Sequence, residues 1–450
     1  MGDRTLNGLL LSVREADQRL HAGERVSERA FVAAPHEYRN HLRGPIVMEI
    51  AYLIPEFPGQ THSFFWRERI ALKEIGVATH LVSTRRPPSA IISHDWAVQA
   101  QSETFYLSEI RLTDFLRTAI QLMRFGPTAW LKSIKAAMDG CPLRKLPLNF
   151  AIIFFAVRLI TFMRIKGVTH VHSHSCADSA LLTMLANQLA GVSYSLTLHG
   201  DLQDYGAQQG VKWRNAAFAI TITSRLHHQV SKLLAKDLPR KLGIAPMGID
   251  THVFKRLKSY KPWNGEGPLR LFSCGRLNRI KGHQDLIQAV SILKKSGLSV
   301  RLEIAGEDET GGRGFHKELD TLIRDLHLVE EVILLGAVGE NRVLEGLRAA
   351  HIFILASHHE PLGVAIMEAL SCETPVIATN IGGIPELIDH GANGHLVPSQ
   401  DPTALAISIR DLANNPALAK KYSASARPRI ETSFNSSLSA MELKRLLETS

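Results

Sequence analysis

The chain has 450 residues, of which 45% are hydrophobic and 21% charged, a composition typical of a soluble globular protein but too long for one ordinary core. We therefore expect two or three domains. Four cysteines, at positions 141, 176, 274 and 372, form no CxxC pair, which argues against a disulfide framework and favours reduced core thiols in the cytoplasm. Only Leu9 to Leu11 form an apolar run near the N-terminus, too short for a signal peptide, so secretion is not expected.

The first part of the chain predicts an extension followed by an α/β unit. Residues 1–44 are polar and rich in charges, and we expect them to lie outside the core. A helix is predicted over 61–75, with further helical stretches later in this part. Alternating strands and helices indicate a parallel sheet covered on both faces. The predicted strands are 46–54, 78–83, 168–173, 194–198 and 218–223.

Residues 107–169 account for much of the net charge of +9, since they contain ten basic residues against three acidic ones. Apolar residues such as Phe115, Leu116, Ile120 and Leu131 have the spacing of amphipathic helices. A basic amphipathic surface suits an anionic membrane face, and the alternative is a solvated helix pair that covers the sheet. Nucleic-acid binding is not expected, because the segment lacks interleaved surface aromatics and a known reading motif.

The run from 146 to 163 is strongly apolar, but Arg158 interrupts it and Pro147 shortens it. A helix that spans a membrane needs roughly 20 apolar residues, and a charge near its centre is costly. The run therefore predicts a buried helix rather than a membrane span.

A loop rich in glycine and proline at 262–268 marks a boundary, and a second α/β series follows it. Two doubly wound units that face one another form a cleft at the carboxyl ends of their strands. The predicted strands are 269–274, 300–305, 331–335, 352–355, 375–378 and 395–397. The predicted helices are 282–296, 315–327, 340–349, 363–371 and 384–389.

Residues 360–371 combine two carboxylates with the start of a helix. Glu360 precedes the first turn and Glu368 lies in the second, while Gly363 lets the backbone pass close to a ligand. The leading N–H groups of such a helix bind phosphate. Carboxylates beside them suit sugar or ribose hydroxyls, although the same pair could also serve as general acid and base.

Arg276 and Lys281 follow the first strand of the second unit. Arginine offers a planar fork and lysine a point charge, so the two could reach one diphosphate together. Taken alone, they could equally be surface cations at a strand end.

His170, His172 and His174 alternate along a predicted strand and could share one face. Imidazoles are common metal ligands, but no carboxylate cluster accompanies these three in the sequence. We therefore expect no metal there. His174 would lie nearest the cleft.

A set of motifs in the second unit carries a family resemblance. The motifs are Gly275-Arg276-Leu277 with Lys281-Gly282, Ala305-Gly306-Glu307, Gly336 before a helix, Glu360 with Glu368, Thr374-Pro375-Val376-Ile377-Ala378, and Gly382-Gly383-Ile384-Pro385-Glu386. With them the chain resembles the glycosyltransferase group 1 proteins, the family-4 retaining glycosyltransferases, which have the two-domain GT-B fold. The resemblance spans about 46 to 445 and is strongest over 269–400.

This resemblance implies a nucleotide-sugar donor in the C-terminal domain. Arg276 and Lys281 would then contact the diphosphate, Glu360 the sugar hydroxyls and Glu368 the ribose. His199 matches a cleft histidine near the transferred sugar, so it joins Arg276, Lys281 and Glu360 as a catalytic candidate. Further donor contacts are implied for Glu307, Leu362, Gly363 and Val364.

The residues on the implied acceptor side match the family pattern less well than those on the donor side. Many members have a Gly-Gly pair where this chain has Pro58-Gly59-Gln60-Thr61-His62-Ser63-Phe64. This loop is similar to the Ser-Glu-Thr-Phe loop of exopolysaccharide-building members, with His62 in place of glutamate. The implied acceptor residues are Gly59, Thr61, His62, His174 and Asp201.

The resemblance also implies a domain plan. It comprises the N-terminal extension (1–44), an acceptor-side Rossmann-like domain (45–245), a linker (246–268), a nucleotide-sugar-binding domain (269–430) and a C-terminal helix (431–450) that could pack back on the N-terminal domain. The chain lacks Asp-x-Asp, the metal-diphosphate anchor of the other major glycosyltransferase fold. We therefore expect a metal-independent enzyme without a cofactor.

The sequence and the resemblance thus predict a retaining glycosyltransferase that moves a sugar from a nucleotide-sugar donor to a growing glycan. The expected glycan is a lipid-linked polysaccharide of the exopolysaccharide type. The enzyme would work in the cytoplasm, peripherally on the inner face of the cell membrane. A nucleotide-sugar epimerase or a glycan synthase on the same fold is an alternative. An alternative of another class is a non-catalytic scaffold protein that binds sugar nucleotides.

Overall fold

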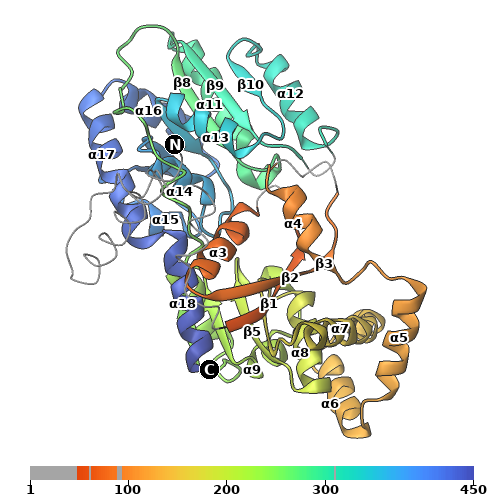
Figure 1. The fold of residues 1–450 in the computed structure, drawn as a ribbon. Coiled ribbons are helices and arrows are strands. Elements are labelled where there is room, and N and C mark those ends of the chain that lie inside the picture. The colour runs from red at the N-terminus through yellow and green to blue at the C-terminus, as the bar shows by residue number, and fades with distance from the viewer. Residues whose placement is uncertain (1–47, 60–61, 89–93, 309–310) are drawn as a thin grey trace, which may run out of the picture. The chain divides into compact units, whose positions relative to one another are not determined.

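The computed structural model describes residues 48–59, 62–88, 94–308 and 311–450, and the structural statements below concern these residues (Figure 1). The expected extension at 1–44 lies outside them, as do residues 46–47 of the first predicted strand. The described chain forms two parallel sheets with helices packed around them, which confirms the predicted pair of doubly wound α/β units.

Seven parallel strands form the sheet of the N-terminal half, in the order β3-β2-β1-β4-β5-β6-β7. The middle of β1 is fully buried, as expected for a strand covered by helices on both faces. The strands are β1 (Met48–Glu56), β2 (Val77–Arg85), β3 (Phe105–Tyr106), β4 (His170–Ser173), β5 (Ser193–Leu198), β6 (Phe218–Thr221) and β7 (Leu242–Ile244). The helices are α3 (Ser63–Glu74), α4 (Ala97–Glu103), α5 (Leu112–Met123), α6 (Pro127–Met138), η3 (Leu143–Lys145), α7 (Leu146–Lys166), α8 (Asp178–Ala190), η4 (Leu202–Tyr205), α9 (Gln209–Arg214) and α10 (Ser224–Leu233).

Six parallel strands form the sheet of the C-terminal half, in the order β10-β9-β8-β11-β12-β13. The strands are β8 (Leu269–Cys274), β9 (Val300–Ala305), β10 (Val332–Leu334), β11 (Ile352–Leu355), β12 (Val376–Thr379) and β13 (His395–Val397). The helices are η5 (Arg279–Lys281), α11 (His283–Lys295), α12 (Phe315–Asp325), α13 (Glu340–Ala349), α14 (Val364–Ser371), α15 (Ile384–Leu387), α16 (Pro402–Ala413), α17 (Pro416–Ser433) and α18 (Ser436–Thr449).

Each sheet reverses its strand order once. The reversal lies between β1 and β4 in the N-terminal half and between β8 and β11 in the C-terminal half. In open α/β sheets, the crevice outside the carboxyl ends of the strands at such a point is where ligands bind. The topology therefore marks the loops after these four strands as the place to look for a site.

The predicted strands are present, with bounds that shift by at most two residues. The short strands β3 and β7 were not predicted, because two or three residues are too few to show a period. Helices α16 and α17 were also missed. Pro428 lies inside α17, where a proline normally signals the end of a helix.

Helix α7 contains the long apolar run and forms part of the core. By length and composition, Leu143–Lys166 could cross a membrane, with a mean hydropathy of 2.0, but 56% of its most apolar window is buried inside the protein. Arg158 is buried as well, and its Nη2 donates to the carbonyl oxygen of Glu109 at 2.9 Å. The run is therefore largely a buried helix, as predicted.

The end of the chain returns to the N-terminal half. Helix α18 packs against α3, and Nζ of Lys444 donates to the carbonyl oxygen of Ile75 at 2.8 Å. Just before α18, Asn435 pairs with Ile249 in an isolated β-bridge. The C-terminal helix thus supports the helix that carries residues of the candidate site described below.

The histidines of β4 are hydrogen-bonded to hydroxyl groups of the neighbouring strand. His172 is fully buried, with Nδ1 2.7 Å from Oγ of Ser195 and Nε2 2.8 Å from Oγ1 of Thr197. His170 lies 2.7 Å from the same Ser195 oxygen. Burial lowers the pKa of His170 to about 4, and burial followed by the charge of His170 holds the pKa of His172 well below its usual range.

These buried histidines predict a loss of stability in mild acid. Their pKa in the folded state lies below the unfolded value of 6.5, so the unfolded chain binds more protons and stability falls as pH drops below about 6.5. Each histidine that stays neutral should contribute a slope of about 1.4 kcal/mol per pH unit. Urea unfolding at several pH values between about 5 and 7 measures this slope. His172→Gln should reduce the slope by about 1.4 kcal/mol per pH unit, the contribution of one histidine. A free energy of unfolding that does not depend on pH in this range would contradict the prediction.

Candidate functional site

A cavity of about 350 Å³ lies where the reversal points of the two sheets face each other. Both halves contribute to its walls, so neither half forms it alone. From the N-terminal half it is lined by Ser63, Phe64, Arg67, His94 and His199. From the C-terminal half and the connection to it come Met247, Phe254, Cys274, Gly275, Arg276, Ile280, Lys281, Ala305, Gly306, Val338, Glu340, Val343, Leu355, His359, Glu360, Pro361, Leu362, Gly363, Val364, Ala365 and Glu368.

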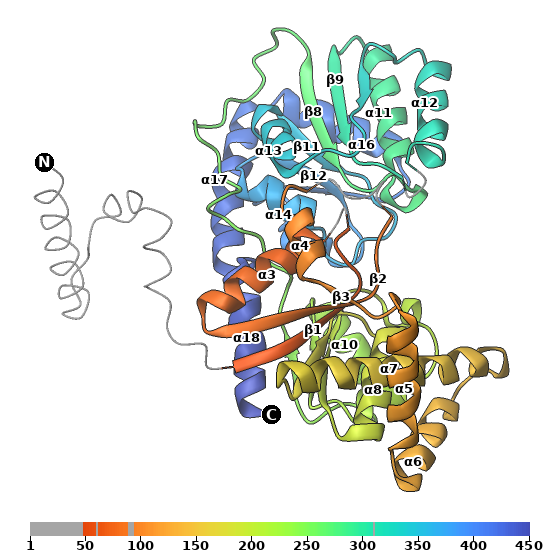
Figure 2. The ribbon, with the colours of Figure 1, turned by 45° about the vertical axis from the view of Figure 1, so that its right-hand side comes forward.

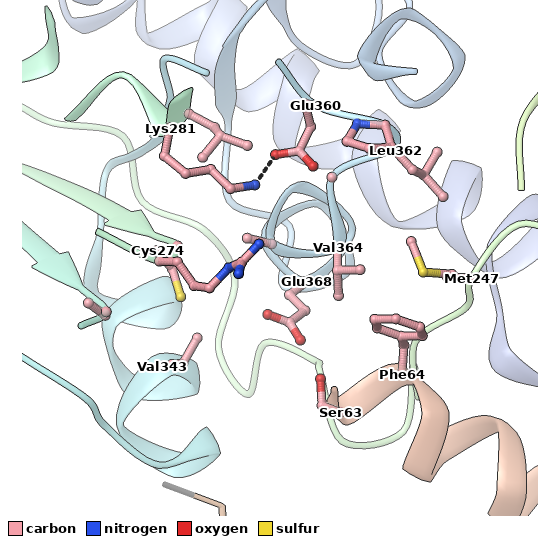
Figure 3. Close-up of a pocket in the computed structure, with 18 of the residues that line it drawn as sticks. Ser63, Phe64, Met247, Cys274, Lys281, Val343, Glu360, Leu362, Val364 and Glu368 are labelled. Carbon is pink, nitrogen blue, oxygen red and sulfur yellow. Dashed lines mark hydrogen bonds and ion pairs between the residues drawn. The ribbon is translucent and has the colours of Figure 1, made fainter. Parts of the chain in front are cut away.

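Lys281 and Glu360 form an ion pair on one side of this cavity (Figure 3). Nζ of Lys281 lies 2.5 Å from Oε2 of Glu360, and Oγ of Ser357 approaches the same oxygen at 3.4 Å. Among the described residues, Oε1 of Glu360 has no hydrogen-bond partner. One oxygen of this buried carboxylate is therefore available to a ligand.

Two glycines hold the loop that carries Glu360. The backbone N–H of Gly383 donates to the carbonyl oxygen of Glu360 at 3.0 Å. Gly382 has φ +57, and a Cβ there would lie 1.8 Å from the same carbonyl oxygen, so any side chain would push the loop away. Gly363, with φ +107, is the residue at which the loop turns into α14. The Gly-Gly-Ile-Pro-Glu motif therefore fixes the position of Glu360.

Arg67 of α3 reaches across to the second carboxylate of the site. Its Nη1 and Nη2 each donate to Oε1 of Glu368 at 3.0 Å, and Nη2 also donates to Oε2 of Glu340 at 2.7 Å. The guanidinium lies over the ring of Phe254, 4.7 Å from its centroid. Within the described chain, Oε2 of Glu368 accepts no hydrogen bond, so this carboxylate too keeps one available oxygen.

The electrostatics of this ion pair follow from its burial. Arg67 and Glu368 are both over nine-tenths buried. Burial opposes the charge of Arg67, but Glu368 and Glu340 more than offset it and raise its pKa above the usual value. Burial raises the pKa of Glu368, Arg67 opposes the rise, and the negative charge of Glu340 adds to it. The two charges in this wall therefore depend on each other.

His199 follows β5 and forms part of the opposite wall. Its Nε2 lies 3.2 Å from Nδ1 of His174, while its Nδ1 is buried and has no hydrogen-bond partner among the described residues. Burial, with the charge of His62 adding to it, lowers the pKa of His199 to about 3. The imidazole is therefore neutral near pH 7 and can exchange a hydrogen bond with a ligand, but it carries no charge.

The sequence-predicted donor residues mostly meet in this cavity. Arg276, Lys281, Glu360, Leu362, Gly363, Val364 and Glu368 line it, together with His199. Glu307 does not. Its Oε1 accepts from the backbone N–H of Asp308 at 2.8 Å and lies 2.9 Å from Nδ1 of His316, so this carboxylate organises the loop after β9.

Of the predicted acceptor residues, the four that the structure describes do not line the main cavity. His62 packs between Phe57 and Phe65, and burial with the charge of Arg276 lowers its pKa to about 4. Gly59 lies directly against the His62 ring, and His174 lines a smaller cavity behind His199. Thr61 lies outside the described residues.

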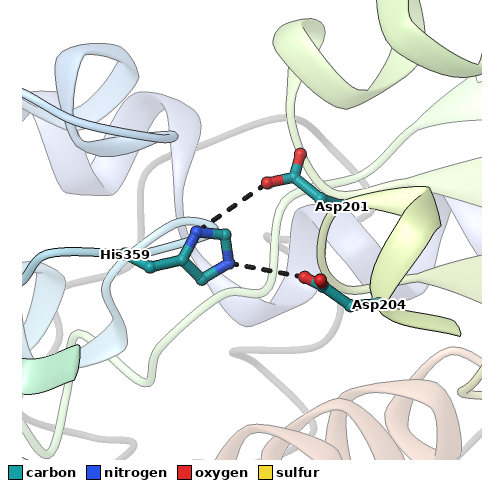
Figure 4. Close-up of side chains that lie close together, drawn as sticks. All are labelled: Asp201, Asp204 and His359. Carbon is teal, nitrogen blue, oxygen red and sulfur yellow. Dashed lines mark ion pairs between the residues drawn. The ribbon is translucent and has the colours of Figure 1, made fainter. Parts of the chain in front are cut away.

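Asp201 belongs to a bridge between the two halves rather than to the cavity wall. Its Oδ1 lies 2.7 Å from Nη2 of Arg225, and its Oδ2 lies 3.8 Å from Nδ1 of His359. Nε2 of His359 in turn lies 3.6 Å from Oδ2 of Asp204, so this histidine stands between two carboxylates (Figure 4). Asp201 therefore takes part in a contact that joins the loops after β5 and β11, and its role at the acceptor stays a prediction.

Two important residues were not identified from the sequence. Arg67 directly follows the aromatic run Phe64-Phe65-Trp66 of a predicted helix, a position that could have indicated a buried ion pair. Glu386 was noted only as part of a motif, yet its two oxygens accept the backbone N–H groups of Ser224 and Arg225 at 2.9 Å each. It caps the start of α10 in the other half of the chain.

A second cavity, of about 380 Å³, opens at the carboxyl edge of the N-terminal sheet. One wall is apolar and comes from Leu148, Ile152 and Phe155 of α7, with Leu182 of α8. Polar groups also line it, among them the carboxylate of Asp178. The cavity therefore suits a molecule with an apolar part and a polar part.

Comparison with known protein families decides the class of the C-terminal half. A family model described as "Glycosyl transferases group 1" matches residues 257–429. This region is a group 1 glycosyltransferase domain. It contains Arg276, Lys281, Glu360 and Glu368, so the cations and carboxylates discussed above lie within the matched range. The resemblance inferred from the motifs is confirmed.

Two curated relatives are named as biosynthesis glycosyltransferases, one for amylovoran and one, as putative, for colanic acid. The amylovoran biosynthesis glycosyltransferase AmsK of Erwinia amylovora is 33% identical over 224 residues, which cover 48% of this chain and 53% of AmsK. The putative colanic acid biosynthesis glycosyltransferase WcaL of Salmonella typhimurium is 30% identical over 218 residues, covering 47% and 52%. The chain thus spans about half the length of the curated relatives it matches.

A solved structure extends the similarity to both halves. Anabaena Alr3699/HepE in complex with UDP-glucose superposes with a TM-score of 0.66 at 15% identity, covering 89% of this chain and 100% of that one. At this identity the comparison concerns the fold. It confirms the predicted GT-B fold, with two Rossmann-like domains.

The Arg67 ion pair predicts a large loss of stability when its cation is removed. Arg67→Met leaves Glu368 buried without its partner, which should lower the free energy of unfolding by about 3–5 kcal/mol. Lys73→Met, at an exposed position of the same helix, is the matched control and should change it by less than about 0.5 kcal/mol. Urea unfolding measures both.

A double variant separates charge from packing. Glu368→Gln in the Arg67→Met background removes the unpaired charge and should recover part of the lost stability. If the double variant is no more stable than Arg67→Met alone, the loss does not come from the ion pair.

Proposed function

We propose that this protein is a glycosyltransferase that moves a sugar from a nucleotide-sugar donor to a growing glycan in the biosynthesis of an exopolysaccharide. One observation carries the proposal: two carboxylates, each with one available oxygen, line the same cavity as Arg276 and Lys281. That combination suits a ligand with hydroxyl groups at both ends and a diphosphate between them. The names of AmsK and WcaL and the UDP-glucose bound to HepE support the same class of reaction.

In this proposal Arg276 and Lys281 hold the donor diphosphate. The leaving group gains negative charge as the bond to the sugar breaks, so fixed cations stabilise the transition state more than the bound donor. Glu360 accepts hydrogen bonds from the sugar through Oε1, and Glu368 accepts them from the ribose through Oε2. Because two cations already supply positive charge, we propose that the reaction needs neither a metal ion nor a cofactor.

His199 lies across the cavity from these groups. Its low pKa keeps it neutral, so its role is to exchange a hydrogen bond with the sugar rather than to carry charge. We assign no protein nucleophile. Retention of the anomeric configuration is proposed on the family resemblance, with the leaving phosphate assisting attack of the acceptor from the same face.

The acceptor is proposed to be lipid-linked. The second cavity combines the apolar wall of α7 and α8 with a polar rim, which fits an amphiphile better than a free sugar. Such an acceptor would place the reaction on the cytoplasmic face of the cell membrane, where we propose that the protein works as a peripheral enzyme.

Removal of either member of the Lys281 and Glu360 pair should abolish transfer. Lys281→Ala and Glu360→Ala should each lower turnover by about 100-fold or more, because each removes a group that contacts the reacting donor. Arg279→Ala is the matched control, since Arg279 lies in the same short helix but is exposed and paired with Glu318. Transfer to a glycan acceptor measures turnover, and circular dichroism checks the fold. Undiminished turnover in Lys281→Ala would overturn the assignment.

The donor can be identified by its effect on thermal stability. A ligand that binds only the folded state raises the melting temperature, so UDP-, GDP- and ADP-sugars are compared with and without EDTA. We expect one donor class to stabilise the protein equally in both conditions. With that donor, proton NMR of the product should show the donor's anomeric configuration. Release of free epimerised sugar without any acceptor would favour an epimerase, and binding without transfer would favour a non-catalytic scaffold.

A further inference from the structure

Helices α5 and α6 lie at the periphery of the N-terminal half (Figure 2). Both expose large apolar side chains. On α5, Leu112, Leu116, Ile120 and Met123 follow one another at intervals of three or four residues, so they form one stripe along the helix. Leu112 and Met123 are each 77% exposed. The surface continues with Leu131 and Met138 of α6, Leu143 of η3, and Leu148 and Phe150 of α7.

Exposed cations surround this apolar surface. The exposed basic residues of the segment are Arg111, Arg117, Arg124, Lys132, Lys135, Arg144, Arg164 and Lys166. Its acidic residues beside α5 face cations of the protein, because Glu109 pairs with Arg86, and Oδ2 of Asp114 lies 4.0 Å from Nη1 of the buried Arg158. The surface is therefore both apolar and positively charged.

A solvated helix pair that merely covers the sheet does not explain this arrangement. A covering helix turns its apolar stripe towards the core, whereas the one fully buried side chain of α5 is that of Thr118. Leu116 and Ile120 are about half exposed. The apolar stripe of α5 thus faces outward.

The helices are nevertheless firmly attached to the protein. The ring of Phe115 packs on Phe154 of α7 with centroids 5.4 Å apart, and Nε1 of Trp130 donates to the carbonyl oxygen of Leu122 at 3.2 Å. Nδ2 of Asn149 at the start of α7 donates to the carbonyl oxygen of Ala137 at 2.7 Å. The exposed side chains therefore lie on helices that are fixed to the rest of the protein.

We propose that α5, α6, η3 and the first turn of α7 form a docking surface for an anionic lipid bilayer. Apolar side chains that project between cations match the boundary between acyl chains and negatively charged headgroups. A second protein could cover the apolar stripe, but the excess of unpaired cations around it favours a negatively charged partner. Leu148 belongs both to this surface and to the wall of the second cavity, so docking brings that cavity to the bilayer.

The inference does not depend on the transfer reaction, and its test needs no donor. The full chain is sedimented with vesicles of phosphatidylcholine alone, or with about 30% phosphatidylglycerol, at about 50 mM and about 500 mM NaCl. We expect binding to the anionic vesicles at low salt, and at least about tenfold weaker binding to neutral vesicles or at high salt.

Two variants with matched controls locate the surface. The first is the double variant Leu116→Glu with Met123→Glu, which places negative charge in the apolar stripe. The second is the double variant Arg117→Glu with Lys132→Glu, which reverses the charge beside the stripe. Each should weaken vesicle binding at least about tenfold. The controls are Leu257→Glu with Val329→Glu, and Lys258→Glu with Arg301→Glu, at exposed positions of the C-terminal half. These should bind like the wild type.

Several results would overturn the proposal. One is the absence of binding to anionic vesicles at low salt, and another is equal binding by the wild type and the surface variants. A dimer in light scattering that Leu116→Glu with Met123→Glu dissociates would assign the surface to a second copy of the chain. Circular dichroism and the donor-induced thermal shift should be unchanged in the surface variants, which separates a failure of docking from a failure of donor binding.

Discussion

The buried contact of Arg67 with Glu368 and Glu340 is the interaction on which the cavity depends. A carboxylate that is more than nine-tenths buried is stable in its charged form only with a cation beside it. That cation comes from α3 of the N-terminal half, while both carboxylates come from the C-terminal half. The same contact therefore keeps Glu368 charged and joins the two walls. α18, which packs against α3, supports this arrangement from the end of the chain.

Glu360 and Glu368 share an arrangement that makes burial compatible with ligand binding. In each, the protein's own cations occupy one oxygen, Oε1 in Glu368 and Oε2 in Glu360, and the other oxygen stays available. A ligand hydroxyl can therefore bind without first displacing Arg67 or Lys281. This matters energetically, because removal of one partner from a buried ion pair costs several kcal/mol, more than a single neutral hydrogen bond returns.

The sequence predicted what local patterns determine. Strands and helices around the cavity follow from hydrophobic periodicity, and the loop of Glu360 follows from glycines that no other residue can replace. Contacts between residues that are distant in the chain could not be predicted. Arg67 and Glu368 are separated by 301 positions, and the local sequence around either residue does not identify the other as its partner. For the same reason the contacts of Asp201 with Arg225 and of Glu307 with His316 were not predicted.

The location of positive charge says more about function than the net charge of +9. Arg67 and Arg158 are buried inside the protein, where Arg67 pairs with carboxylates and Arg158 donates to the carbonyl oxygen of Glu109. Lys281 belongs to the cavity. The cations of α5 and α6 are instead exposed and lie beside apolar side chains that are exposed as well. Of these groups, this last one can act on a partner as large as a membrane, because the field of exposed charges reaches about 8 Å in physiological salt, whereas the charge of a buried cation is neutralised by its partner.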